Sequence, residues 1–335
     1  MKFLRFLGLA AAISMICGCA SEAPVSRTFF AMDTVMTVTA YGGKDSLSLC
    51  EERITELENL LSAQKSDSDA ARLNSSHGNE TTLSADASFL LGEVLDFCRE
   101  TDGIYDPTVY PLVKEWGFIS GDYKIPESAK ISELLTNIGF EKITLNGNTA
   151  SIPDDFELDF GACAKGYAAD ELKKILTVNG VTSALLDLGG NILTVGKKPD
   201  GAAWKIGVAD PFSPSESAGT LLLSDCAAVT SGGYERYFTA DNGKRYCHII
   251  DPRTGCPADG GIASVTVVGQ NGTRCDMLST VLFIMGAEKA ADFWRGAGDF
   301  DMLIITDDGK MLITEGLSDR FTPAEKYAEA EVMRK

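Results

Sequence analysis

Short strand signals joined by turn signals dominate the second half of the chain, and they limit its possible folds most. Asp241-Asn242-Gly243 lies between strand-like runs at 234–238 and 245–250, which is a strong signal for a two-stranded hairpin. Asn146-Gly147 and Asp308-Gly309 mark two more hairpins. Further strand signals follow one another at 184–188, 192–195, 205–208, 221–223, 227–230 and 265–268. Successive hairpins of this kind predict mostly antiparallel sheets.

Amphipathic helices accompany these strands. Apolar residues recur at helical spacing from Leu47 to Leu61, and Ser84 begins a second helix. Other helices are expected at 165–176 and 274–285, and an opening strand at 29–41. Helices mixed with hairpins predict an α+β fold with mixed, mostly antiparallel sheets and packed helices. The chain has no G-x-G-x-x-G, which argues against a doubly wound dinucleotide-binding domain.

The first residues have the pattern of an export signal rather than of a folded segment. Lys2 and Arg5 precede an apolar run at 6–16 that is too short to span a bilayer. The following Ile16-Cys17-Gly18-Cys19 resembles a bacterial lipobox, so residues 1–18 are expected to be removed and Cys19 to carry the lipid. An ordinary signal peptide with incidental cysteines is the alternative. Residues 19–28 would then form a lipidated tether, 29–325 the folded domain and 326–335 a polar tail.

Charge and cysteine content exclude several classes of function. The formal net charge is −18, so binding to nucleic acid or to an anionic membrane surface is not expected. Attachment to the membrane would have to come from the lipid. The nine cysteines form no C-x-x-C pair, and a chain of 335 residues needs no disulfide scaffold. Neither a disulfide framework nor a zinc site is predicted.

Two segments far apart in the sequence indicate phosphate chemistry. Residues 158–167 read as a strand running into a tight Gly/Ala turn that opens a helix, with Lys165 in its first turn. Exposed N–H groups at a helix start favour a phosphate, and a lysine there is explained if a phosphate lies beside it. Asp276 and Thr280 are four residues apart on one helix, so both oxygens face the same way. With a carbonyl from the Gly161-Ala162 turn they could hold Mg²⁺.

Single residues in these segments have other possible roles. Asp159 could contact a ligand, or it could cap the helix that follows. Lys165 could also be a solvated surface lysine. His248, one of two histidines, could transfer a proton or simply bond to backbone within its strand. The glycines of the segment 231–236 could let the backbone approach a ligand, or form a tight turn.

Taken together, these motifs resemble the ApbE family, the FAD:protein FMN transferases. The resemblance runs from Phe30 over some 250 residues, so it is far more specific than any one motif. Its segments, as they stand here, are Ala31-Met32-Asp33-Thr34, Leu61-Ser62-Ala63-Gln64, Arg72-Leu73-Asn74, Gly103-Ile104-Tyr105-Asp106-Pro107-Thr108, Asp159-Phe160-Gly161-Ala162-Cys163-Ala164-Lys165-Gly166-Tyr167, Leu186-Asp187-Leu188-Gly189-Gly190-Asn191, Ser231-Gly232, His248-Ile249-Ile250-Asp251-Pro252-Arg253-Thr254-Gly255 and Asp276-Met277-Leu278-Ser279-Thr280.

The resemblance implies a two-lobed single domain related to the T-fold, and an extracytoplasmic enzyme that cleaves FAD with Mg²⁺. FMN would be joined through a phosphoester to a Thr or Ser of a partner flavoprotein, typically a subunit of a membrane electron-transport complex, and AMP would leave. The metal would be held by Ala162, Asp276 and Thr280, and His248, Asp276 and Lys165 would be catalytic. FAD would contact Met32, Gln64, Ile104, Tyr105, Asp106, Asp159, Lys165, His248 and Ile250. The protein would be lipid-anchored on the periplasmic side of the bacterial inner membrane.

Two positions depart from the family pattern. Gln64 stands where many transferases have an aromatic residue, and Asp33 stands where glycine is common. Loss of a stacking ring at Gln64 could loosen FAD binding or admit water to the phosphate. A Mg²⁺-dependent FAD pyrophosphatase that gives FMN and AMP is therefore the second hypothesis. A lipoprotein that holds FAD without catalysis is the third.

Overall fold

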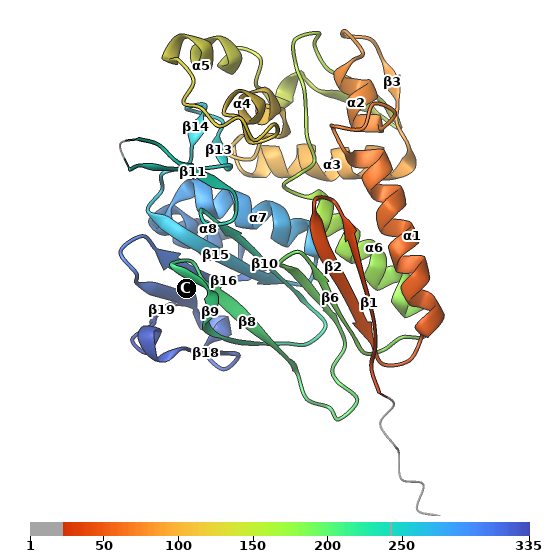
Figure 1. The fold of residues 1–335 in the computed structure, drawn as a ribbon, viewed down its shortest axis with the longest axis vertical. Helices are drawn as coiled ribbons and strands as arrows, with labels where there is room; N and C mark the ends of the chain where they lie inside the picture. The colour runs from red at the N-terminus through yellow and green to blue at the C-terminus, as the bar shows by residue number, and fades with distance from the viewer. Residues whose placement is uncertain (1–22, 242) are drawn as a thin grey trace, which may run out of the picture.

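The computed structural model of the protein describes residues 23–241 and 243–335. The predicted signal, Cys19 and the start of the predicted tether lie outside the described residues. The fold is built on one nine-stranded sheet with the order β1-β2-β6-β7-β10-β15-β16-β17-β19, antiparallel except where β17 pairs with β19 (Figure 1). Its strands are β1 (Val25–Ala31), β2 (Thr34–Ala40), β6 (Ala184–Leu188), β7 (Asn191–Val195), β10 (Ala227–Gly232), β15 (Ile262–Gly269), β16 (Asp301–Thr306), β17 (Met311–Thr314) and β19 (Glu331–Met333).

Helices cover one face of this sheet and a smaller sheet covers the other. Strand alternation separates the two cores: Met302 and Ile304 of β16 join the helix side, whereas Leu303 and Ile305 join the other side. The helices of the first core are α1 (Lys44–Leu61), α3 (Ala85–Glu100), α6 (Ala164–Val178), α7 (Gly272–Met285) and α8 (Ala287–Ala297). The smaller sheet contains β8 (Trp204–Asp210), β9 (Ser213–Leu223) and β18 (Phe321–Pro323).

A second group of elements lies above one end of the large sheet in Figure 1. Leu73, Leu83 and Ala150 belong to the first core, whereas Leu112, Trp116, Phe118 and Ile250 form a separate apolar cluster in this group. Its elements are α2 (Asp69–Asn74), β3 (Thr81–Thr82), α4 (Tyr110–Glu115), α5 (Ser128–Leu135), β4 (Thr144–Asn146), β5 (Thr149–Ser151), β11 (Tyr237–Thr239), β12 (Arg245–Cys247), β13 (Ile250–Asp251) and β14 (Cys256–Pro257). Four short 3-10 turns lie at Pro107–Val109, Phe140–Lys142, Glu315–Leu317 and Glu325–Tyr327.

The α+β prediction is confirmed, and the strand at 184–188 and the helices starting near 84, 165 and 274 lie where the sequence placed them. The opening strand does not: it is a hairpin of β1 and β2 that turns at Met32 and Asp33, with φ of 48° and 60°. The seven cysteines within the described residues are free thiols, and six of them are buried. No helix in this part of the chain has the length and apolarity to cross a membrane.

The folded domain extends beyond both of its predicted limits, 29 and 325. Part of the expected tether belongs to β1, where hydroxyl pairs such as Ser26 with Thr39, at 2.8 Å, join the two strands of the hairpin. The expected polar tail contains β19, which pairs with β17 because Val332 and Met333 bury apolar side chains. Between the two ends, the segment 103–116 contains the 3-10 turn Pro107–Val109 and α4.

Candidate functional site

The first turn of α6 is positioned by contacts from the segment that precedes it. Leu158–Phe160, predicted as the end of a strand, forms no regular strand. Instead, the Asn74 amide accepts from the Leu158 N–H at 2.8 Å and donates to its carbonyl at 2.9 Å. The Asp159 N–H donates to the Pro107 carbonyl at 3.1 Å. The side chain of Asn74 thus replaces a neighbouring strand and fixes where the turn before α6 begins.

Asp159 does not cap α6. Its carboxylate accepts from the N–H of Gly161 within the turn, and the helix begins after Cys163 without a side-chain cap. Burial raises the pKa of Asp159 above 3.8, although the Gly161 hydrogen bond and Arg236 oppose this. Lys165 lies in the first helical turn as predicted, and no carboxylate of the described residues lies within ion-pair distance of it. The N–H groups of Cys163 and Ala164 donate to the Phe160 carbonyl, so the ammonium of Lys165 is the group that this helix start offers to an anionic ligand.

Asp276 faces this helix start from α7. Its Oδ2 accepts from the Gly166 N–H at 2.8 Å. Burial raises the pKa of Asp276 above 3.8, while Lys165, Gly166 and Asn191 lower it. Asn191 lies near enough to act on this carboxyl, yet its buried amide nitrogen completes no hydrogen bond within the described residues. This leaves Asp276 with an unused oxygen beside an amide whose donor is also unused.

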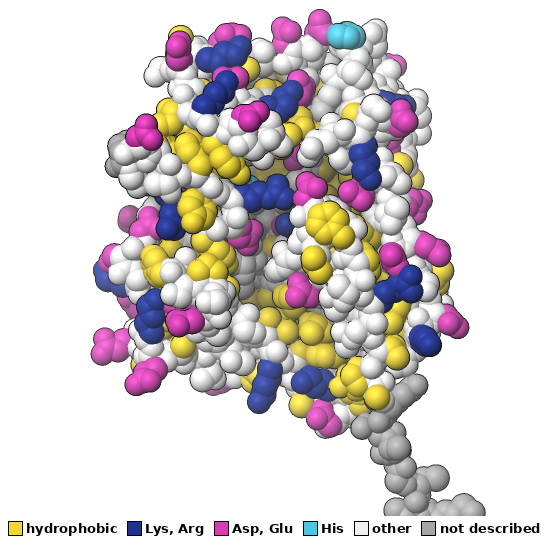
Figure 2. Space-filling model, viewed as in Figure 1, with side chains coloured by type: hydrophobic (Ala, Val, Ile, Leu, Met, Phe, Trp, Pro, Cys, Tyr) yellow, Lys and Arg dark blue, Asp and Glu magenta, His cyan; other side chains and the backbone are white. Residues whose placement is uncertain are grey.

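One cavity of about 440 Å³ collects all of these groups. Every site residue predicted from the sequence lines it, apart from Cys19: Met32, Gln64, Ile104, Tyr105, Asp106, Asp159, Ala162, Lys165, His248, Ile250, Asp276 and Thr280. The same face is hollowed between the β1–β2 hairpin and the β11–β12 hairpin in Figure 2. Their individual roles stay predictions, but the structure brings together motifs that span 250 residues of sequence.

Asp106, in the cavity wall, holds the backbone around it through hydrogen bonds. One carboxylate oxygen accepts from the Thr108 N–H and hydroxyl, at 2.8 and 2.6 Å. The other accepts from the Phe140 N–H at 2.9 Å. Both oxygens are thus engaged within the protein, so a contact to a ligand would have to share one of them.

His248 directly follows β12, and it lines the cavity wall. The Arg236 carbonyl accepts from the His248 N–H at 3.0 Å and lies 3.2 Å from Nδ1. Burial lowers the pKa of His248 from 6.5 to about 4; the bond to Arg236 opposes this, and the charges of Arg236 and Lys165 add to it. The ring nevertheless keeps an intermediate exposure through the cavity, so it is accessible to a bound ligand.

The charges around the cavity fit a divalent cation. Asp276 and Glu235 act on each other and on Lys165, and burial raises the pKa of Glu235 as well. A diphosphate placed here would be repelled by these carboxylates unless a cation lay between them. Asp276, the Thr280 hydroxyl and the Ala162 carbonyl are hard oxygen donors, and Mg²⁺ takes only one or two carboxylates. No group of three His, Cys, Asp or Glu suited to a metal occurs in the described residues.

Sequence reasoning missed Glu235 and Asn191 as cavity residues. Both belong to recognised motifs, 231–236 and 186–191, but neither was given a role. Membership of those motifs was the only signal that could have found them. Their proximity to Asp276 arises from strand packing, because Asn191 opens β7 and Glu235 follows β10.

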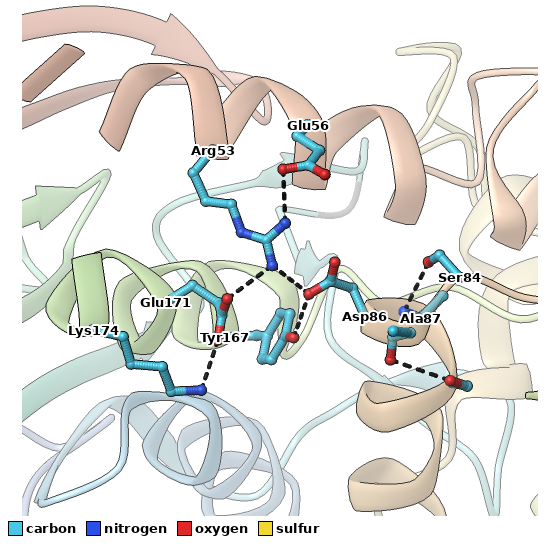
Figure 3. A network of polar contacts seen from close by, with 10 residues as sticks. Arg53, Glu56, Ser84, Asp86, Ala87, Tyr167, Glu171 and Lys174 are labelled. Atoms are coloured by element: carbon cyan, nitrogen blue, oxygen red, sulfur yellow. Dashed lines mark hydrogen bonds and ion pairs between the residues drawn. The ribbon is translucent and has the colours of Figure 1, made fainter. Parts of the chain in front are cut away.

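A polar network away from the cavity anchors α6 to the two helices beside it. Arg53 of α1 forms ion pairs with Asp86 of α3 and Glu171 of α6, the latter at 2.8 Å (Figure 3). The Tyr167 hydroxyl, two residues beyond Lys165, donates to Asp86 at 2.7 Å. These contacts fix α6, the helix that carries Lys165, to α1 and α3.

The sequence matches the family model described as "ApbE family" over residues 32–304. It is 33% identical to the FAD:protein FMN transferase of Treponema pallidum, over 92% of this chain and 93% of that protein. The FAD:protein FMN transferase of Vibrio cholerae is 31% identical, over 95% and 98%. Among solved structures, the ApbE protein of Thermotoga maritima superposes with a TM-score of 0.83 at 27% identity, over 89% and 99% of the two chains. The apo flavinyl transferase ApbE of Pseudomonas stutzeri gives a TM-score of 0.81 at 27% identity, over 90% and 98%.

Proposed function

This chain belongs to the ApbE family, and on that premise we propose that it is an FAD:protein FMN transferase. The substrates are FAD and a Thr or Ser hydroxyl of an exported or membrane flavoprotein, and the second product is AMP. The observation that carries the proposal is the cavity lined by every predicted site residue of the folded domain. Its carboxylates, lysine and histidine are the groups that phosphoryl transfer requires.

The proposed enzyme depends on Mg²⁺, which Asp276, Thr280 and the Ala162 carbonyl would hold. When bound, the ion supplies charge stabilisation for the diphosphate oxygens. The support is the donor set and the two carboxyl groups of Asp276 and Glu235, which act on each other in the cavity beside Lys165. Removing Mg²⁺ should therefore weaken the equilibrium binding of FAD, and this effect can be measured without any turnover.

Different residues of this chain would bind the diphosphate and accept the proton. Lys165, in the first turn of α6, binds the diphosphate. His248, held through Nδ1, accepts the proton of the acceptor hydroxyl at Nε2 as its oxygen bonds to the FMN phosphorus. The bond from that phosphorus to the bridging oxygen breaks, and AMP leaves with the bridging oxygen. Positioning and charge account for the catalysis, because no covalent enzyme intermediate is needed.

A pyrophosphatase activity is the second candidate, and one observation favours it. Gln64 is exposed at the cavity wall, where it offers polar groups rather than a ring. Water that reaches the phosphate there would replace the acceptor hydroxyl and release free FMN.

One experiment separates the three hypotheses. The purified domain is incubated with FAD and Mg²⁺, with and without a candidate acceptor flavoprotein, and AMP, FMN and fluorescent protein are measured. A fluorescent acceptor band with equimolar AMP supports the transferase. Free FMN and AMP without acceptor labelling identify a pyrophosphatase, whereas bound, intact FAD would identify a carrier protein and overturn the proposal.

We further propose that Cys19 carries a lipid that anchors the domain on the periplasmic side of the inner membrane. The support is the lipobox-like Ile16-Cys17-Gly18-Cys19 after an apolar run. The acceptor is then expected to be a subunit of a membrane electron-transport complex. Cys19→Ser should release the protein from the membrane fraction and abolish labelling by radioactive palmitate; unchanged labelling would contradict the anchor.

A further inference from the structure

The β11–β12 hairpin, which leads directly into His248, is a two-stranded sheet of its own. Such ribbons are only marginally stable alone, so the position of His248 depends on what the hairpin packs against. Phe238 of β11 stacks on Tyr123, with ring centroids 5.4 Å apart and planes at 12°. Phe238 also stacks on Tyr246 of β12, at 5.3 Å and 21°. The hairpin is therefore held by rings from the segment that follows α4.

Trp116 completes this arrangement. Its ring lies 5.3 Å from that of Tyr246, and its indole N–H donates to the buried Gly255 carbonyl at 2.9 Å. We call Trp116, Phe118, Tyr123, Phe238 and Tyr246 the aromatic clasp. The clasp joins two segments more than one hundred residues apart in the sequence, and both reach the cavity, through Ile119 on one side and His248 on the other.

Phe118 is the member of the clasp that contacts His248. The Phe118 ring lies 6.4 Å from the imidazole, edge to face at 68°. It is only 7% exposed and also contacts Tyr123 and Phe238, at 5.6 and 5.9 Å. Because Tyr123 and Phe238 pack against it, the Phe118 ring is fixed in place and limits how far the imidazole can rotate.

The remaining contact of the imidazole determines which nitrogen carries the proton. The Arg236 carbonyl, 3.2 Å from Nδ1, can only accept a hydrogen bond. The favourable neutral tautomer therefore has its proton on Nδ1 and a lone pair on Nε2. Arg236 directly precedes β11, so its carbonyl moves with the hairpin that the clasp holds. The charged groups that act on the imidazole are Arg236 and, from α6, Lys165.

We propose that the aromatic clasp, through Phe118, is the positioning element that keeps His248 in the Nδ1–H tautomer with Nε2 available to the cavity. Phe118 touches neither substrate nor metal in this proposal, so it is a positioning residue. The catalytic consequence rests on the proposed function, but the tautomer itself does not. The two can therefore be tested separately.

The test uses the small number of histidines in the chain. In protein labelled with ¹⁵N-histidine, His77→Gln leaves His248 as the only labelled imidazole, and its nitrogen shifts report the tautomer directly. In this background we compare the parent with Phe118→Leu, which removes the ring, and Phe118→Tyr, which keeps it. Phe300→Leu is the matched control, because Phe300 is a buried phenylalanine (6% exposed) whose ring pairs with Phe293 and which does not line the cavity.

We expect Phe118→Leu to give averaged tautomer shifts and a pKa of His248 closer to 6.5, whereas Phe118→Tyr and Phe300→Leu keep the parent shifts. FMN formation should fall roughly tenfold in kcat for Phe118→Leu, with KM for FAD unchanged.

Parent-like shifts in a folded Phe118→Leu protein would overturn the proposal. If that variant does not fold, Phe238→Leu, which removes the ring that Phe118 packs on, decides in its place. A parent protein that releases no AMP would refute the proposed function, while the shifts would still decide the role of the clasp.

Discussion

The N–H of Gly166 donates to the carboxylate of Asp276 at 2.8 Å, so the first turn of α6 and the proposed metal ligand of α7 hold each other in place. The two helices can approach this closely because Gly166 has no side chain. A Cβ at this position would lie 2.3 Å from the Gly272 carbonyl oxygen and 2.7 Å from the Cβ of Asp276. The helix turn that carries Lys165 and the proposed metal ligand Asp276 are therefore one structural unit.

Gly166→Ala should damage both stability and the site. The added methyl would collide with backbone of α7, which cannot yield as a flexible side chain would, so we expect a loss of about 1–3 kcal/mol in the free energy of unfolding. Mg²⁺ affinity, measured by calorimetry, should fall with it. Gly92→Ala in α3 is the control: its Cβ meets nothing closer than 3.8 Å, so it should stabilise by about 0.5–1 kcal/mol. Equal behaviour of the two variants would contradict the close-packing argument.

Asp276→Asn should remove metal-dependent turnover while leaving the fold intact. Asparagine keeps an oxygen to accept from Gly166 but loses the charge that attracts a cation. We expect kcat for AMP release to fall by roughly three orders of magnitude, as several kcal/mol of charge stabilisation disappear. Binding of FAD without Mg²⁺, followed by flavin fluorescence, should become tighter because a repulsive carboxylate is gone. Weaker metal-free binding would show that Asp276 contacts FAD in some other way.

The pH dependence of kcat/KM should show an unusually low acid limb. His248 must be neutral to accept a proton, and its pKa lies at about 4 rather than 6.5 because of burial and nearby cations. Activity should therefore be nearly constant from pH 8 down to 5.5 and fall near pH 4. His248→Gln should lower the rate and abolish that limb. A limb that persists in this variant belongs to Asp276 or Glu235, whose pKa values burial raises above 3.8 and 4.5.

Local patterns in the sequence predicted those parts of the fold that depend on neighbours along the chain. The strand at 184–188 alternates in burial, and α7 places Asp276 and Thr280 on one face because they are four residues apart. The first hairpin was missed for a local reason as well. Its turn uses Met32 and Asp33 in the left-handed region, without the glycine that normally signals such a turn.

Contacts between distant segments could not be derived from residue patterns alone. Nothing near Asn191 indicates that its amide lies beside Asp276, and nothing near Phe118 indicates that its ring meets His248. Resemblance to a family placed the predicted site residues together; they line one cavity, and their roles stay predictions. Residues that support those motifs from outside, such as the clasp, follow only from tertiary packing.

The Arg53 network should contribute to stability through the charges it satisfies. Burial alone would raise the pKa of Asp86, but hydrogen bonds from Arg53 and Tyr167 outweigh it and hold the pKa below 3.8. Glu171 behaves in the same way: hydrogen bonds from Lys174 and Arg53 outweigh burial and hold its pKa below 4.5. Carboxyls with lowered pKa values stabilise the fold above the unfolded values, and this stabilisation is lost as the pH falls through the folded ones.

Arg53→Met should therefore destabilise the protein by about 3 kcal/mol at pH 7, since it leaves two carboxylates with side chains only 18% and 16% exposed without their shared cation. The difference from the parent should shrink as the pH falls below about 4.5 and both carboxyls become protonated. Urea denaturation at pH 7 and pH 3.5 measures both effects. Arg99→Met is the control, because Arg99 pairs with Asp96 on the surface and should contribute less than about 1 kcal/mol. A pH-independent loss in Arg53→Met would show that packing of the side chain, rather than its charge, anchors α6.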